Sequence, residues 1–220
     1  MPITFKDIKT SKEVNTYIKQ ADTTLEVLGF TEHSFVHTNK CAEVAGKLLQ
    51  DLGYSDNEIE LAKIAAYMHD IGNVINRTDH AQSGAVMAFR ILDKMGMKPE
   101  DTAAIITAIG NHDEKTAYPV NAIAAAVILA DKTDVRRSRV RCQDAVYFDI
   151  HDRVNYAVEK TELKLNHEEK TLTVYFTIDT KISSVMDYFE IFLDRMLLCR
   201  KAANFFGLKF KININGSNLL

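Results

Sequence analysis

The stretch "IELAKIAAYMHDIGN", residues 59–73, joins an apolar helical run to two ionisable residues, His69 and Asp70. The run has the composition of a buried helix, and Ser55 and Glu58 stand before it at the spacing of a capping box. An imidazole and a carboxylate at the end of such a helix are costly to bury unless they are paired or bind a metal ion. The stretch therefore predicts a helical core that ends in a chemically active pair.

The composition is that of a globular protein with one sizeable core. The chain has 220 residues, of which 46% are hydrophobic and 26% charged, and its net charge of −3 argues against bulk nucleic-acid binding. We expect no membrane segment, because no stretch approaches the roughly 18 apolar residues of a span and the N-terminus has no apolar signal core. The odd, unpaired cysteines Cys41, Cys142 and Cys199 are typical of a reducing compartment, so we expect a cytoplasmic protein.

Up to about residue 158, nearly every periodic segment is helical. The spacing of apolar residues predicts helices over 11–29, 37–53, 55–68, 79–96, 98–112 and 121–135. Asp79 is a candidate N-cap, and Pro99 lies in a first turn, where its missing N–H does no harm. The segment 121–135 is apolar almost all round, which predicts a buried helix.

The period of the pattern changes near residue 160. Apolar and polar residues alternate on either side of "NHEEK", residues 166–170, which predicts a β-hairpin. A long helix over 183–207 and a third strand over 208–216 follow. We therefore expect a mostly α protein, with a helical domain at 1–158 and a small C-terminal α+β unit of β-β-α-β order at 159–220.

Histidines concentrate in the helical part of the chain. A single histidine near an apolar face is most simply a hydrogen-bonded core residue, but five of the seven lie between residues 33 and 112, and Asp131 interrupts the apolar run 124–130. Helices that each bring a histidine or an aspartate to one point form metal sites. Nitrogen and oxygen donors suit Mn, Fe, Co, Ni or Zn, and no cysteine shares the spacing expected of a thiolate zinc site. The five histidines are His33, His37, His69, His80 and His112.

The order of these residues resembles that of the HD-domain metal-dependent phosphohydrolases over about residues 30–142. The family's pattern of a histidine, a His-Asp pair and a distant aspartate is matched by His37, His69-Asp70 and Asp131. The resemblance implies an all-α bundle in which these four residues hold a divalent cation, with His69 and Asp70 at the catalytic centre. His33 also precedes the helix, but the apolar pattern that follows His37 favours His37 as the ligand. His33 is left as a residue that orients the site, an extra ligand, or a surface or capping residue.

The resemblance extends to members of the family that bind two ions. It implies that His80 and His112 hold a second ion, with Asp70 as a bridge, so that the chain binds one or two ions. The order is similar to that of enzymes that cleave symmetrical dinucleoside tetraphosphates and of cyclic-dinucleotide phosphodiesterases. Two residues depart from the phosphodiesterases: Asn73 replaces a lysine, and Asn111 replaces the first histidine of a pair.

Residues next to the expected ligands are candidates for proton transfer and phosphate binding. The resemblance implies that a bound ion activates water. Asp113 or Asp79 is then placed to orient that water or to move a proton, against a surface or capping role for each. Lys132 and Arg136, in the basic run 132–141, are candidates for binding the substrate phosphate, against a reading of the run as a solvated face.

We therefore expect a metal-dependent phosphohydrolase, either a phosphatase or a phosphodiesterase, that cleaves a phosphate ester or anhydride of a nucleotide or a similar small molecule. The alternative is a catalytically silent sensor that keeps the fold and binds nucleotide or metal. A purely structural metal site is disfavoured, because the expected ligands leave positions for water. The sequence leaves open whether the C-terminal hairpin shapes the cleft or mediates homodimerisation, and it does not identify the substrate.

Overall fold

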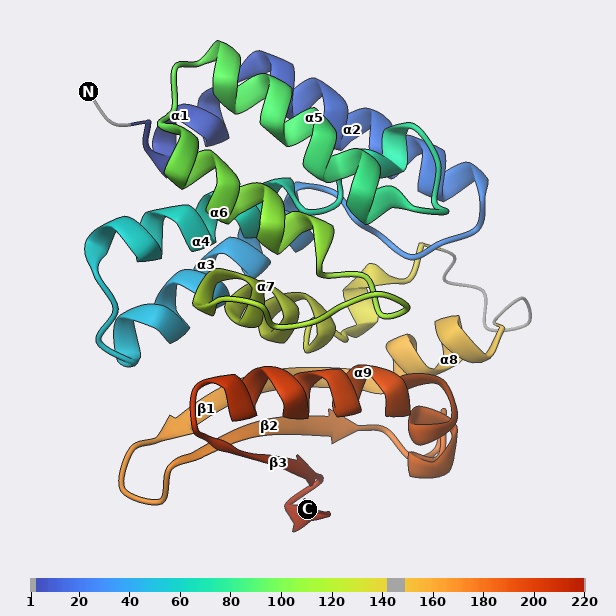
Figure 1. Cartoon of the computed structure of the whole chain (residues 1–220). Coiled ribbons are helices and arrows are strands. Elements are labelled where there is room, and N and C mark those ends of the chain that lie inside the picture. Colours follow the sequence, from blue (N-terminus) through green and yellow to red (C-terminus); the bar gives the residue numbers. More distant parts are fainter. Residues whose placement is uncertain (1–2, 142–148, 220) are drawn as a thin grey trace. The chain divides into compact units, whose positions relative to one another are not determined.

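The computed structural model describes residues 3–141 and 149–219, so Cys142 lies outside the described residues (Figure 1). The chain divides into two compact units, Met1–Asp131 and Lys132–Leu220, called here the N-terminal and C-terminal units. The first strand starts at Val158, next to the expected domain boundary, whereas the division into compact units falls after Asp131. Among the described residues, no helix has both the length and the apolar character that crossing a membrane requires.

The N-terminal unit is helical, as the sequence predicts. The capping box forms at the start of α4: the Ser55 hydroxyl accepts the Glu58 N–H, and the Glu58 carboxylate accepts the Ser55 N–H. The short 3-10 helix η1 (Ile71–Val74) follows α4. The α-helices are α1 (Phe5–Thr10), α2 (Lys12–Val27), α3 (Phe35–Asp51), α4 (Asp56–Met68), α5 (His80–Lys94), α6 (Pro99–Gly110) and α7 (Ala122–Lys132), the last of which ends one residue beyond the unit.

Helices α3 and α4 pack together as a hairpin, and so do α5 and α6 (Figure 1). Gly53 and Gly96 end α3 and α5 with φ of +78° and +82°, a backbone region that glycine adopts readily. Pro99 is the first residue of α6, as expected. Asp79 takes the N-cap position of α5 but makes no side-chain cap bond, because its left-handed backbone (φ 56°, ψ 28°) departs from the extended form that N-caps use.

The predicted burial of α7 is confirmed. Residues 124–129 of this helix are fully buried on all sides. A second close contact lies between η1 and the first turn of α5. A Cβ placed on Gly72 would come within 2.0 Å of the His80 carbonyl oxygen, so only glycine allows the two backbones to approach this closely. This contact brings the end of α4 and the start of α5 together.

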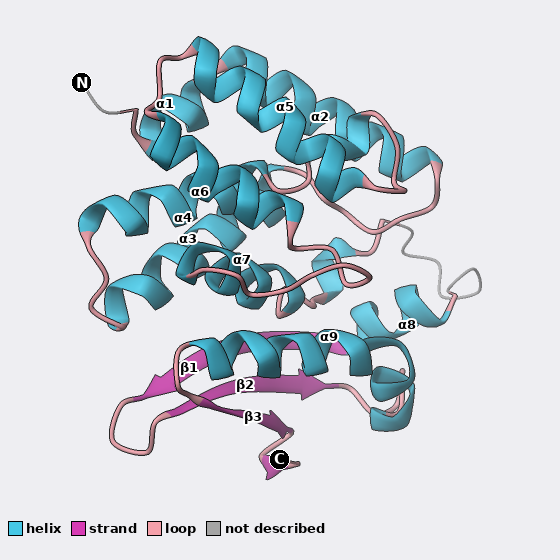
Figure 2. Cartoon of the chain, viewed as in Figure 1, coloured by secondary structure: helices cyan, strands magenta, loops and turns pink. Residues whose placement is uncertain are grey.

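The C-terminal unit is a four-stranded sheet with a long helix on one face (Figure 2). The strand order is β1-β2-β3-β4; β2 and β3 are parallel, and the other neighbouring pairs are antiparallel. Helix α9 connects the parallel pair, as such a crossover requires. The elements are η2 (Arg137–Arg139), α8 (Ile150–Ala157), β1 (Val158–Asn166), β2 (Thr171–Ile178), α9 (Val185–Phe205), β3 (Lys209–Ile214) and β4 (Ser217–Asn218).

The expected β-β-α-β order is confirmed, with the two-residue strand β4 added. Within α9, the apolar residues Leu193 and Phe205 are 48% and 43% exposed. Helix α7 ends at Lys132, three residues before the expected end at residue 135, and Arg136 has extended backbone angles.

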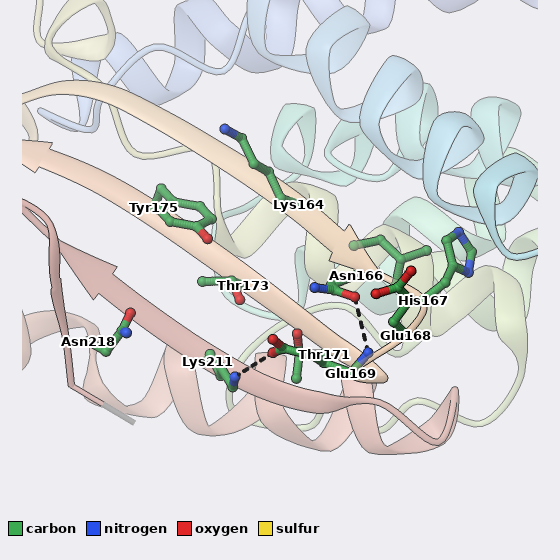
Figure 3. A pocket seen from close by; sticks show the side chains of 11 residues that line it. Lys164, Asn166, His167, Glu168, Glu169, Thr171, Thr173, Tyr175, Lys211 and Asn218 are labelled. Carbon is green, nitrogen blue, oxygen red and sulfur yellow. Dashed lines mark hydrogen bonds and ion pairs between the residues drawn. The ribbon is translucent and has the colours of Figure 1, made fainter.

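The sheet also carries a polar hollow of about 710 Å³ (Figure 3). Lys164 and Lys211 line it together with Tyr175. Both lysines are paired with carboxylates: Lys211 lies 3.0 Å from Glu169, and Lys164 lies 3.3 Å from Glu162. Because its positive charges are compensated locally, the hollow has no excess charge with which to attract a phosphate.

Candidate metal centre

His69 and Asp70 occupy the junction between α4 and η1. His69 follows the last residue of α4 and keeps helical angles, whereas Asp70 turns to φ −96° and ψ 2° and begins η1. This change of direction points both side chains inward, and their residues are 0% and 5% exposed. The apolar run 59–68 thus ends in a buried imidazole next to a buried carboxylate.

Four of the expected ligands converge in a first donor group within the N-terminal unit. Asp70 Oδ2 lies 3.1 Å from His69 Nε2 and 3.7 Å from His37 Nε2. Asp131 Oδ1 lies 3.4 Å from His37 Nε2 and 3.7 Å from His69 Nε2. The Nε2 atoms of His37 and His69 are 3.4 Å apart. His37 lies in α3, the His69-Asp70 pair follows α4, and Asp131 lies in α7. Residues distant in the sequence therefore meet at one point.

The other oxygen of Asp70 faces a second donor group. Asp70 Oδ1 lies 3.5 Å from His80 Nε2 and 3.8 Å from His112 Nε2, and these two nitrogens are 3.1 Å apart. His80 is the first residue of α5, and His112 follows α6. The donor atoms of Asp70, His80 and His112 all lie within 4.8 Å of one another, a spacing that could hold a metal ion. One carboxylate therefore serves both groups.

Three imidazoles are oriented in the same way. The Nδ1–H groups of His69, His80 and His112 donate to the carbonyl oxygens three residues earlier, at 2.7, 3.0 and 2.6 Å. With the proton on Nδ1, the Nε2 lone pair is left to accept a proton or bind a metal ion. Such lone pairs repel each other at 3.1 Å unless a positive charge lies between them. The donor set therefore fits divalent ions that accept nitrogen and oxygen ligands.

Burial and neighbouring charges shift the pKa values of His69 and Asp70 in opposite directions. Burial lowers the pKa of His69, but Asp70 and Asp131 outweigh it and raise that pKa to about 10. Burial raises the pKa of Asp70, but the neighbouring imidazoles, His69 above all, hold it well below its usual value. The pKa of His80 is lowered to about 4, and burial is the largest cause. The centre therefore keeps an ionised carboxylate next to a site that attracts positive charge.

Three further residues contact the donor groups in roles that the sequence interpretation did not assign to them. Cys41 Sγ lies 3.6 Å from His37 Nδ1, and the spacing of these residues (i, i+4 on one helix) was a usable signal. The Asn73 amide donates to Asp70 Oδ1 at 2.8 Å, and Arg77 Nη1 lies 3.3 Å from His80 Nε2. Asn73 and Arg77 follow no periodic pattern, so only the turn geometry after Asp70 reveals them.

The remaining candidate residues lie outside the two donor groups. The ring of His33 packs edge-on against His37 with 5.4 Å between centroids, and its Nδ1 lies 2.6 Å from the Thr31 carbonyl oxygen. Asp113 follows His112 and is half-buried, whereas Asp79 is exposed.

The basic run is largely tied to its own unit. Arg136 Nε donates to Asp134 Oδ1 at 3.0 Å, and Arg139 Nη1 donates to the Asp134 carbonyl oxygen at 2.9 Å. Arg137 Nε donates to the Tyr156 carbonyl oxygen at 2.7 Å. Lys132 is the last residue of α7 and is buried. A phosphate-binding role for Lys132 and Arg136 stays a prediction.

Fold and site together define a helical protein with a buried histidine–aspartate centre suited to divalent metal ions. The family model described as the HD domain matches residues 34–190, which is more than half of the sequence, and the chain belongs to the HD-domain family.

Two further proteins are similar to the chain. The uncharacterized protein MJ1020 of Methanocaldococcus jannaschii is 26% identical over 190 residues, covering 75% of this chain and 72% of that protein. A crystal structure of a predicted HD superfamily hydrolase from an uncultured Thermotogales bacterium is 26% identical, with a TM-score of 0.46 over 57% of this chain and 68% of that one.

Proposed function

We propose that the protein is a metal-dependent phosphohydrolase that acts on a small phosphorylated substrate, a nucleotide being the first class to test. The observation that carries the proposal is the placement of Asp70, whose two carboxylate oxygens face two neighbouring donor groups. Membership of the HD-domain family supports a hydrolytic role for that centre. The nucleotide substrate and the cytoplasmic location are predictions that rest on the sequence.

In this proposal, His37, His69, Asp70 and Asp131 hold the first ion. Asp70, His80 and His112 hold the second, and four or three protein atoms leave positions open on a six-coordinate ion such as Mn²⁺ or Fe²⁺. The open positions distinguish a catalytic site from a structural one, in which protein atoms complete the shell. The choice between one and two ions depends on His80 and His112, because the contacts among His37, His69, Asp70 and Asp131 form without them.

A divalent ion bound there would lower the pKa of water and offset charge on phosphoryl oxygens. The protein's own residues prepare the site for this chemistry. The Nδ1–H bonds of His69, His80 and His112 keep their Nε2 atoms aimed at the donor groups before any ligand arrives. The Asn73 amide donates to one oxygen of Asp70, so the carboxylate is held with its two oxygens facing the two donor groups. Asp113 adjoins His112 and is the residue we assign to orienting water or accepting a proton.

The first experiment compares metal content and phosphate release in the wild type, Asp70→Asn and Asp93→Asn. Asp70→Asn keeps the size of the side chain and removes the charge from the shared ligand. Asp93 is an exposed acid on α5 and serves as the matched control. Each protein is loaded with Mn²⁺ or Fe²⁺ and assayed against nucleoside phosphates, dinucleoside tetraphosphates, cyclic dinucleotides and sugar phosphates.

We expect one or two ions per chain and metal-dependent phosphate release in the wild type and the control, with both lost in Asp70→Asn. Bound metal without turnover of any substrate would favour the silent sensor over the enzyme. Equal metal content in wild type and Asp70→Asn would reject Asp70 as a ligand.

A further inference from the structure

Arg77 lies in the turn between η1 and α5 and contacts the second donor group. Its Nη1 donates to Asn73 Oδ1 at 3.2 Å and to His80 Nε2 at 3.3 Å, and it lies 4.0 Å from Asp70 Oδ1. The carbonyl oxygen of the same residue accepts the Nδ1–H of His80. Arg77 therefore hydrogen-bonds to both nitrogens of the His80 imidazole, to Nδ1 through its carbonyl oxygen and to Nε2 through its side chain.

The guanidinium is only partly engaged by these contacts. Its side chain is 29% exposed, and its Cζ lies 5.4 Å from the centre of the Phe30 ring. Within the described residues, the Nε and Nη2 groups have no hydrogen-bond partner. A guanidinium has five N–H donors in a rigid fork and stays charged at any pH that the protein tolerates. Arg77 thus presents a permanent charge and several open donors at the edge of a buried centre.

An ion in the second donor group would change what Arg77 can bind. The lone pair of His80 Nε2 can serve the ion or the Arg77 N–H, but not both. The ion and the guanidinium also repel each other at such short range, unless an anion lies between them. A tetrahedral oxyanion meets both demands, because one oxygen faces the ion while others accept the free N–H groups of the fork.

We propose that Arg77 binds the phosphoryl oxygens of the substrate next to the group formed by Asp70, His80 and His112. This inference rests on the proposed function and names the residue that recognises the phosphate. It assigns that role to a residue outside the basic run 132–141. In that run the Arg136 guanidinium already donates to Asp134. The N-terminal unit contains one other arginine, Arg90, which pairs with Glu13 on the surface and is 68% exposed in its side chain.

Binding of inorganic phosphate to the Mn²⁺-loaded protein tests the proposal without any turnover. Calorimetric titrations compare the wild type with Arg77→Met, Arg77→Lys and the matched control Arg90→Met, and the metal content of each sample is measured alongside. We expect Arg77→Met to bind phosphate at least about tenfold more weakly, as the loss of charge-assisted hydrogen bonds implies. Arg77→Lys should recover part of the affinity, since it restores the charge without the fork. Arg90→Met and all metal contents should be unchanged.

Three results would overturn the proposal. Phosphate affinity of Arg77→Met within twofold of the wild type would show that the guanidinium does not contact the anion. Loss of an ion in Arg77→Met and Arg77→Lys, in proportion to the loss of phosphate, would show that Arg77 maintains the donor group instead. A metal-loaded wild type that binds no phosphate would also reject it. By contrast, phosphate binding that depends on Arg77 in a protein without hydrolytic activity would reject only the proposed enzyme.

Discussion

Gly72 and His80 are in such close backbone contact that a Cβ on Gly72 would come within 2.0 Å of the His80 carbonyl oxygen. The same Cβ would lie 2.5 Å from the Gly84 nitrogen, so no side-chain movement could relieve the clash. The contact joins η1, which begins beside Asp70, to the first turn of α5, which carries His80. The distance between the two donor groups therefore depends on the absence of a side chain at residue 72.

Gly72→Ala should separate Asp70 from His80. We expect a loss of about 3 kcal/mol or more in the free energy of unfolding, because a backbone clash is relieved only by moving whole elements. Metal binding at the second group should be lost at the same time. Chemical denaturation and metal analysis measure the two effects. Gly110→Ala is the control. Gly110 is the last residue of α6, and a Cβ there would make an ordinary 3.7 Å contact with Ala85 of α5. Equal stability of the two variants would contradict this account.

Asn73→Ala should weaken the second ion more than the first. The amide donates to Asp70 Oδ1 and to the Asp70 carbonyl oxygen, so its removal frees the oxygen that faces His80 and His112. Loss of such an outer hydrogen bond costs about 10- to 100-fold in metal affinity. Titration with Mn²⁺, followed by electron paramagnetic resonance, separates the two sites. Asn76→Ala, which alters an exposed turn residue, is the control. Unchanged affinity at both sites would mean that Asp70 is oriented by its other contacts alone.

Metal removal should lower the melting temperature of the wild type. A ligand that binds only the folded state adds about 2.7 kcal/mol of stability when present at 100 times its dissociation constant. Addition of Mn²⁺ to chelator-treated protein should restore the melting temperature, and Asp70→Asn should not respond. Scanning calorimetry with and without the ion measures both. A response of Asp70→Asn equal to that of the wild type would place the bound ion elsewhere.

The start of α9 should make the C-terminal unit sensitive to acid. Hydrogen bonds from the Ser184 and Ser183 side chains lower the pKa of Asp187 below its usual value. A carboxyl whose pKa is lower in the folded state stabilises that state above its unfolded pKa, and this stabilisation is lost as the pH falls through the lowered folded value. Asp187→Asn should therefore unfold at a lower temperature than the wild type at pH 7.

The difference between Asp187→Asn and the wild type should shrink as the pH falls below about 4, the ordinary range of the aspartate pKa. Melting temperatures at pH 7, 5 and 3 record the trend. Asp194→Asn on the same helix is the control, because Asp194 is exposed and lies outside the capping box. A constant difference between Asp187→Asn and the wild type at all three pH values would argue against the carboxylate as its source.

Local sequence patterns predict most of the fold. The helix starts at Ser55 and Pro99 and the hairpin around residues 166–170 follow from nearby residues, so the sequence predicts them directly. The exposure of Leu193 and Phe205 does not follow in this way, because apolar spacing alone does not say how wide a helix face the sheet covers. The two-residue strand β4 is too short to leave a periodic signal.

The candidate site was less completely predictable. His37, His69-Asp70 and Asp131 form an ordered pattern along the chain, and the structure brings them together. Asn73 and Arg77 form no such pattern, since their contacts depend on the path of a turn. Cys41 shares no metal-ligand spacing with the other cysteines, and only its i, i+4 spacing with His37 indicates the contact. Side chains that support a centre are selected by three-dimensional distance, which a linear pattern records only within one helix.

The hydrogen bond from each Nδ1–H to a carbonyl three residues earlier has a consequence for how the centre tolerates change. Ring direction is encoded within single turns at His69, His80 and His112, whereas the separation of the rings is encoded by the packing of whole helices. The direction of each ring and the distance between the rings can therefore vary independently in evolution. A lengthened loop or a shifted helix would alter the affinity of the centre for an ion, or its preference among ions, while the identity of the coordinating atoms stays the same.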